Sequence, residues 1–131
     1  MSRVPLGEPP QHVVLPDSIT QVTQDQAGKI VVTGSHGGVS AAHYARTVAA
    51  RLHVFNDAGI GREEAGIAAL ALLELEGLAA VAASHLSARI GEARDTWDCG
   101  VVSRVNAPAQ RLGLRPGVEL RRALSILPGV D

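Results

Sequence analysis

The stretch VVTGSHGGVSAAHYA, residues 31–45, carries the strongest fold signal in the sequence. An apolar strand, Lys29–Thr33, runs into a short loop before a helix begins. Glycine allows a sharp turn or a close approach of two backbones, and the loop holds three of them: Gly34, Gly37 and Gly38. The stretch therefore predicts a strand–loop–helix unit with Ser35 and His36 in its loop.

The same order of elements recurs along the chain. We expect a strand at His53–Phe55 before a helix at Arg62–Glu76, and a strand at Leu78–Ala83 before a helix that ends near Trp97. A fourth strand, Gly100–Val105, follows. Short apolar strands that alternate with helices are typical of βαβ units in a mostly parallel sheet. The sequence predicts a compact three-layer α/β domain, with a sheet of about four strands and helices on both faces.

The length of 131 residues favours a single domain. Residues 1–16 are expected to form a flexible N-terminal arm, because four prolines discourage regular structure there. Residues 17–131 would form the α/β domain, and Asp17 or Ser18 would cap a short helical turn. Two short helical stretches are expected after the last strand, at Pro108–Leu112 and Val118–Leu124.

Composition and charge exclude several classes of function. The chain is 46% hydrophobic and 19% charged, with a net charge of −1, and it has neither a basic block nor a series of aromatic residues on which bases could stack. Nucleic acid is therefore not an expected partner. No apolar run approaches the roughly 18 residues that a membrane span needs. The single cysteine, Cys99, fits a reducing compartment, so we expect a cytoplasmic protein.

The expected helix at 62–76 suggests self-association. Its segment AGIAALALLELEG, residues 65–77, is apolar on almost every side. A helix that is apolar all round is normally buried all round, which a domain of this size does not provide by itself. We therefore expect a homo-oligomer in which this helix meets another subunit.

Polar residues follow three of the expected strands, and this shared position is the strongest functional signal. In open parallel sheets, ligands bind beyond the carboxyl ends of the strands, where the strand order reverses. In a flavodoxin-like order, the first of these strands would lie between the second and third, and the two Ser-His loops would face each other. The polar residues at the strand ends are Ser35, His36, Asn56, Asp57, Ser84 and His85.

These residues suggest acid–base chemistry on a small anion. Imidazole titrates near neutral pH, so His36 or His85 would be the general acid or base, with Asp57 orienting one of them. Arg89 would bind a substrate carboxylate, and free amides of the glycine loop would bind a carboxylate or phosphate. The predicted catalytic residues are His36, His85 and Asp57, and the predicted substrate-binding residues are Gly34, Ser35, Gly37, Gly38, Asn56, Ser84 and Arg89.

Nucleotide cofactors are not expected. The sequence GSHGGV lacks the lysine of a phosphate-binding Walker loop, and neither glycine-rich loop matches G-x-G-x-x-G. We expect an isomerase, lyase or hydrolase that needs no cofactor. Four alternatives stay open: covalent catalysis by Ser35 with His85, a metal site of His36, His85 and Asp57, a non-catalytic binding or regulatory domain, and a structural oligomer.

Overall fold

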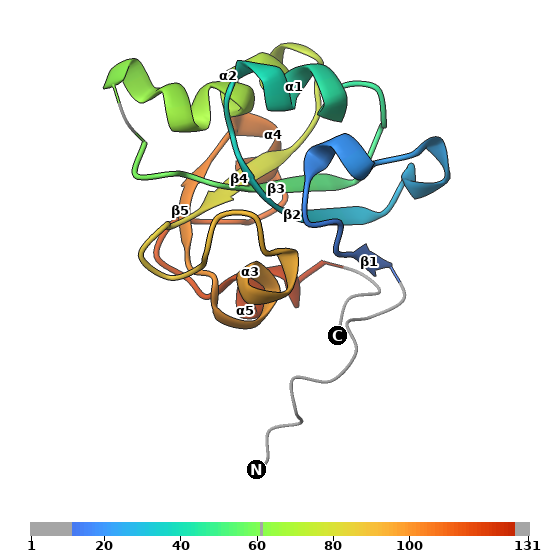
Figure 1. The fold of residues 1–131 in the computed structure, drawn as a ribbon. Helices are drawn as coiled ribbons and strands as arrows, with labels where there is room; N and C mark the ends of the chain where they lie inside the picture. Colours follow the sequence, from blue (N-terminus) through green and yellow to red (C-terminus); the bar gives the residue numbers. More distant parts are fainter. Residues whose placement is uncertain (1–11, 61, 128–131) are drawn as a thin grey trace.

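The computed structural model describes residues 12–60 and 62–127, which form a five-stranded sheet with helices on both faces (Figure 1). The strand order is β1-β2-β3-β4-β5, and only β5 runs antiparallel to its neighbour. The expected α/β fold with a mostly parallel sheet is confirmed, with five strands instead of about four. The strands are β1 Val13–Val14, β2 Ile30–His36, β3 Leu52–Asn56, β4 Ala80–Ala83 and β5 Val102–Val105.

Two strands differ from the expectation. Val13 and Val14 fall in the segment expected to be an irregular arm, yet they pair in parallel with Ile30 and Val31 of β2. Residues 1–11 of that arm lie outside the described residues. β2 also continues to His36, through the first part of the predicted loop, with an irregular register before it pairs with β3.

The helices are shorter than the apolar patterns indicate. The expected helix at 62–76 is divided into a 3₁₀ segment and a shorter α-helix, because Glu64 has a positive φ of 61° and the amide of Gly66 donates to Ile60 instead of continuing a helical ladder. No helix in the described part of the chain is long and apolar enough to cross a membrane. The α-helices are α1 Val39–Ala45, α2 Ala68–Leu75, α3 Ala93–Cys99, α4 Ala107–Arg111 and α5 Leu120–Leu124, and the 3₁₀ segments are η1 Ile19–Gln21, η2 Gln24–Gln26 and η3 Arg62–Ile67.

Helices cover both faces of the sheet (Figure 1), and apolar side chains are buried on either side of it. On one face, α1 and α2 bury small and branched side chains against Phe55 of β3. On the other face, Trp97 of α3 packs with Leu120 and Leu124 of α5 against Val54. Because helices cover both faces of the sheet, polar groups gather at its edges rather than on its faces.

The strand order corrects the flavodoxin-like arrangement. β3 lies between β2 and β4, whereas that arrangement places β2 in the middle. The chain crosses the sheet in one direction, and α1 and α2 lie next to each other on the same face. The two Ser-His segments therefore do not lie on adjacent strands, and the loop after β3, which begins with Asp57, separates them.

The exposed side of α2 bears large apolar side chains. Leu75 is 84% exposed, and Leu72 lies on the same helix with 37% exposure. Leu73 of this helix is buried against the sheet. The homo-oligomer expected from the apolar pattern stays a prediction, and these two leucines are the residues that test it.

Candidate active site

The carboxyl ends of three parallel strands bring predicted site residues to one edge of the sheet. The register pairs His36 of β2 with Asn56 of β3, and Asn56 in turn with Ala83 of β4. These residues form a row across the ends of the strands. Asp57 follows Asn56 directly, and the loop after β4 begins just beyond Ala83.

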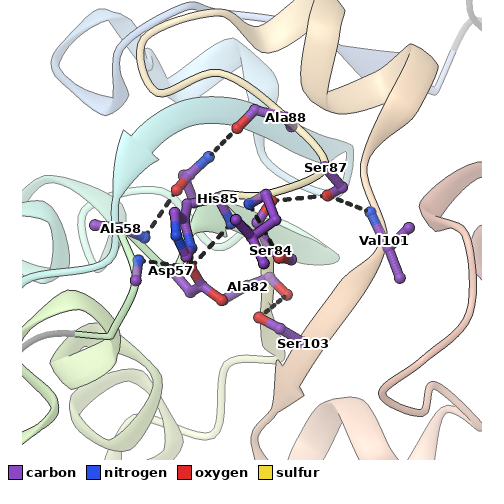
Figure 2. A network of polar contacts seen from close by, with 12 residues as sticks. Asp57, Ala58, Ala82, Ser84, His85, Ser87, Ala88, Val101 and Ser103 are labelled. Carbon is purple, nitrogen blue, oxygen red and sulfur yellow. Dashed lines mark hydrogen bonds and ion pairs between the residues drawn. The ribbon is translucent and has the colours of Figure 1, made fainter.

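Asp57 and His85 are in direct contact (Figure 2). Nδ1 of His85 lies 3.2 Å from Oδ1 of Asp57, and the same oxygen accepts the backbone amide of His85 at 3.0 Å. The Asp57 side chain is 6% exposed, whereas that of His85 is 43% exposed. A carboxylate only accepts hydrogen bonds, so the proton of the neutral ring lies on Nδ1. Nε2 therefore keeps its lone pair and is the ring atom available to a ligand.

Hydrogen bonds keep the Asp57 carboxyl charged. Burial is the largest single influence on its pKa and raises it, because burial disfavours the charged form. Hydrogen bonds from the Ser103 hydroxyl, from the amides of Gly59 and His85 and from the His85 ring together outweigh burial and lower the pKa below 3.8. The amide of Gly59 donates to Oδ1 at 2.8 Å. Asp57 is thus an anion that protein donors hold in place.

A strained turn carries Asp57. Ala58, Gly59 and Ile60 have positive φ angles of 52°, 74° and 68°. A positive φ is unfavourable for a β-branched residue such as Ile60. Residues held in this backbone conformation are often found at functional sites. A Cβ atom on Gly59 would lie 3.5 Å from Cε1 of His85. The turn therefore places Gly59 against the His85 ring.

The loop after β4 is fastened at several points (Figure 2). The Ser87 hydroxyl donates to the Ser84 carbonyl at 2.7 Å and accepts the Val101 amide at 2.9 Å. The Asn56 side chain donates to the carbonyl of Ala88 at 2.9 Å. Because Asn56 of β3 and Val101, the residue before β5, both hold this loop, its histidine has a defined position relative to Asp57.

Gly34 is required by packing rather than by ligand binding. Its carbonyl accepts the amide of Gly91 at 2.7 Å, so the loop after β4 crosses directly over β2. A Cβ atom at Gly34 would lie 2.1 Å from the backbone nitrogen of Glu92. Only a glycine permits this approach of the two backbones.

Two amides expected to bind an anion are already used. The amide of Gly34 donates to the Asp17 carbonyl at 3.0 Å. The amide of Gly37 donates to the carbonyls of Asn56 at 3.1 Å and Gly66 at 2.9 Å. Neither amide is free for a carboxylate or phosphate, which corrects the expectation of an anion cradle built on both.

The predicted substrate-binding hydroxyls support local structure. Ser35 accepts the backbone amide of Ile19 at 2.8 Å, and Ser84 accepts that of Leu86 at 3.1 Å. Among the described residues, no serine hydroxyl has a hydrogen bond to a histidine ring. Covalent catalysis by Ser35 with His85 therefore has no hydrogen bond to activate the nucleophile.

His36 borders a separate part of the same edge. A Cβ atom on Gly38 would lie 3.2 Å from Nε2 of His36, so the ring covers this glycine. Beside the His36 ring is an open hollow of about 390 Å³. Two of the residues that line it, Ala58 and Ile60, belong to the turn that follows Asp57. The hollow is lined by His36, Gly38, Val39, Ala58, Ile60, Ala65 and Gly66.

Arg89 contacts Glu92 and Asp95 rather than the Asp57–His85 pair. Its side chain is 79% exposed and contacts Glu92 at 3.9 Å, while its backbone amide donates to Asp95 at 2.8 Å. An exposed contact of this length contributes little stability. The structure thus places Arg89 on the same loop as His85 without joining it to the pair.

The described residues form no metal centre. Among the side chains that the structure describes, no group of three or more histidine, cysteine, aspartate or glutamate residues is placed to hold a metal ion. The alternative site of His36, His85 and Asp57 is therefore not formed.

Sequence reasoning missed Ser103, which contributes to the lowered pKa of Asp57 and whose hydroxyl donates to the Ala82 carbonyl at 3.2 Å. It lies inside β5, where a serine in a strand carries no signal of a site. Only knowledge that β5 lies beside β4 could have identified it.

Comparison of the sequence with protein-family models, with curated proteins and with solved structures finds no match.

Proposed function

We propose that this protein is a small acid–base enzyme in which His85 transfers protons and Asp57 orients it. The carrying observation is the 3.2 Å contact between Nδ1 of His85 and Oδ1 of Asp57, beside an exposed ring edge. This contact fixes the tautomer that leaves Nε2 as a base. A buried carboxylate that contacts an exposed imidazole is the arrangement in which proton transfer is efficient near neutral pH.

The chemistry follows from the two protonation states of His85. Neutral His85 takes a proton from the substrate through Nε2, and the imidazolium that forms is stabilised by the charge of Asp57. The same nitrogen then returns the proton to another substrate atom or to a leaving group. Isomerisation, elimination and hydrolysis all use this sequence of steps, and none of them requires a nucleotide.

The substrate class is a small anion bound at the carboxyl ends of the strands. With the amides of Gly34 and Gly37 engaged, Arg89 is the side chain proposed to bind its acidic group. Arg89 lies four residues from His85 on a fastened loop, and its exposed contact with Glu92 is weak enough to exchange for a ligand. The hollow beside His36 gives room for the rest of the molecule.

Thermal-shift screening followed by turnover assays tests this proposal. Wild type, His85→Gln and His43→Gln are screened against carboxylated and phosphorylated metabolites, and stabilising compounds are assayed for conversion. His43 is an exposed residue of α1 and serves as the matched control. We expect conversion to fall by about 10²–10⁴-fold in His85→Gln and to be unchanged in His43→Gln.

Two results would count against an enzyme. If compounds bind but wild type converts none of them, the protein is a non-catalytic binding or regulatory domain. If His85→Gln converts the same compound at the wild-type rate, another group carries the chemistry.

A further inference from the structure

Two arginines and an apolar surface meet beside α5, in a part of the molecule that the proposed function does not use. A hollow of about 250 Å³ lies there, lined by the segment at 113–118, by α5 and by the residues that follow this helix. Arg115 comes from the segment and Arg122 from the helix. Among the described residues, none lines both this hollow and the one beside His36.

The backbone that carries the two arginines is anchored. Leu114, directly before Arg115, is 1% exposed and belongs to the apolar core. The amide of Gly117 donates to the Val102 carbonyl at 2.7 Å and fixes the other end of the same turn. Arg122 lies on α5, which buries its apolar residues in that core. Both arginines therefore have defined positions at the hollow.

No carboxylate neutralises either arginine within the described part of the chain. Arg46, Arg89 and Arg94 each form an ion pair with an acidic side chain. Arg115 and Arg122 are exposed and form none with a described residue. The described residues that line the hollow include no aspartate or glutamate. The hollow is thus bordered by two positive charges that no acidic side chain offsets.

The rest of the lining is mainly apolar. Val118, Ala123 and Ile126 line the hollow, and Ile126 is 57% exposed. Gly113 lies close to the same isoleucine, because a Cβ atom there would be 2.9 Å from Cδ1 of Ile126. Apolar atoms of a ligand gain free energy when they cover such a surface. The hollow therefore combines sites for a negative charge and for a short apolar chain.

We propose that this hollow is a binding site for a small organic carboxylate, whose acidic group binds Arg115 and Arg122 and whose apolar chain lies against Val118 and Ile126. A planar guanidinium group matches a carboxylate with two parallel hydrogen bonds. An ion without an apolar part, such as acetate or inorganic phosphate, would leave the apolar side of the hollow uncovered. This site does not depend on the Asp57–His85 pair, so it can be tested separately from the proposed function.

A titration with hexanoate, followed by NMR of the backbone amides at residues 113–126, tests the proposal. Hexanoate is a carboxylate at neutral pH and has a short apolar chain. We expect saturating shifts of these amides in wild type, with a Kd of about 1–10 mM. Arg115→Gln and Arg122→Gln should each raise the Kd about fivefold, because one charged hydrogen-bonding partner is lost. Both side chains are exposed, and the amide spectra show whether the variants keep the fold.

Arg104→Gln is the matched control. It removes the same charge from an exposed residue of β5 that does not line the hollow, so it should leave the Kd unchanged. Ile126→Ser should weaken hexanoate binding, because it removes part of the apolar surface. Acetate should bind about tenfold more weakly than hexanoate, since it lacks most of the apolar chain. Hexan-1-ol should also bind more weakly, because it lacks the charge.

Three results would overturn the inference. The first is hexanoate that produces no saturating shift of the amides at 113–126. The second is a loss of affinity in Arg104→Gln equal to the loss in Arg115→Gln and Arg122→Gln, which would mean that only the overall charge matters. The third is inorganic phosphate or acetate that binds as tightly as hexanoate, which would make the hollow a site for simple anions.

Discussion

The side-chain amide of Asn56 donates to the backbone carbonyl of Ala88 at 2.9 Å, across 32 residues of sequence. Its oxygen meanwhile accepts the amide of Ala58 at 2.8 Å. One fully buried side chain therefore joins the turn that carries Asp57 to the loop that carries His85. The geometry of the Asp57–His85 pair therefore depends on the Asn56 side chain as much as on the direct contact between Asp57 and His85.

Asn56→Ala should lower the free energy of unfolding by about 2 kcal/mol, because it leaves the Ala88 carbonyl without its side-chain donor. Urea unfolding measures this loss. The other buried asparagine of the described chain, Asn106, is the control, since it caps α4 and binds Leu70 and Leu78. Asn106→Ala should cost a similar amount yet leave the His85 ring resonances in place, whereas Asn56→Ala should shift them. Equal effects of both variants on those resonances would contradict the link.

Asp57→Asn should impair both catalysis and acid stability. Loss of the charge that orients and stabilises the His85 imidazolium should reduce kcat/KM on any identified substrate by about 10²-fold or more. The pKa of Asp57 is lowered from 3.8 in the folded protein, so its charged form contributes stability above that pH. This contribution is lost as the pH falls through the lowered value.

Unfolding curves of wild type and Asp57→Asn between pH 7 and pH 3 check the acid effect. The difference in the free energy of unfolding should be largest near neutral pH and should shrink toward the acid end. A difference that stays constant with pH would mean that the charge of Asp57 contributes no stability.

His53 should make the fold sensitive to mild acid. Its ring is fully buried, with Nε2 3.2 Å from the Val48 carbonyl, and Nδ1 has no hydrogen-bond partner among the described residues. Burial lowers the pKa of His53 below 6.5, only partly opposed by backbone hydrogen bonds. Below pH 6.5 the unfolded chain therefore binds a proton that the folded protein does not. The free energy of unfolding should fall as the pH falls from 6.5 toward the lowered pKa.

His53→Leu should remove this part of the pH dependence, even though it costs stability through the lost contact with Val48. Denaturant unfolding at several pH values between 5 and 7.5 gives the slope, in the wild type and in the variant. His43→Gln, on the surface of α1, should keep the wild-type slope. An equally steep slope in His53→Leu would assign the acid sensitivity to another group.

Gly34→Ala should disrupt the crossing of the loop over β2. The new Cβ atom would lie 2.1 Å from the Glu92 nitrogen, and a backbone cannot move aside as a side chain can. We expect a loss of several kcal/mol, of about 3 or more. Gly38→Ala is the control, because the nearest atoms there belong to the His36 ring, which can rotate. Similar melting temperatures for the two variants would refute the close approach.

Leu75→Glu tests self-association. If the predicted homo-oligomer uses the exposed side of α2, a charge at this 84% exposed position should shift the species toward the monomer without unfolding it. Light scattering after size exclusion measures the mass, with Leu112→Glu, on another exposed surface, as control. A wild-type protein that is monomeric at every concentration would end the oligomer hypothesis.

Several features could be predicted from the sequence because their signals are local. Apolar strands such as Ile30–Val32 and Val54–Phe55 can be recognised from residues that are adjacent in the sequence. The polar residues that follow these strands can be recognised in the same way. The choice of Asp57 and His85 as site residues needed nothing more than their position after such strands. The ends of the helices were less predictable, because Glu64 has a positive φ and the backbone at Gly66 lies against Asp57 and donates to Ile60.

The sequence by itself determined the class of fold and the sheet edge where polar residues gather. The reason is that alternating strands and helices produce a periodic pattern of apolar and polar residues along the chain. Only the tertiary structure decided that β3 lies in the middle, that Gly34 serves backbone packing, and that Ser103 of β5 contributes to the lowered pKa of Asp57. These relations join residues far apart in the chain. Their energies depend on which strands pair, and no local pattern of side chains records that choice.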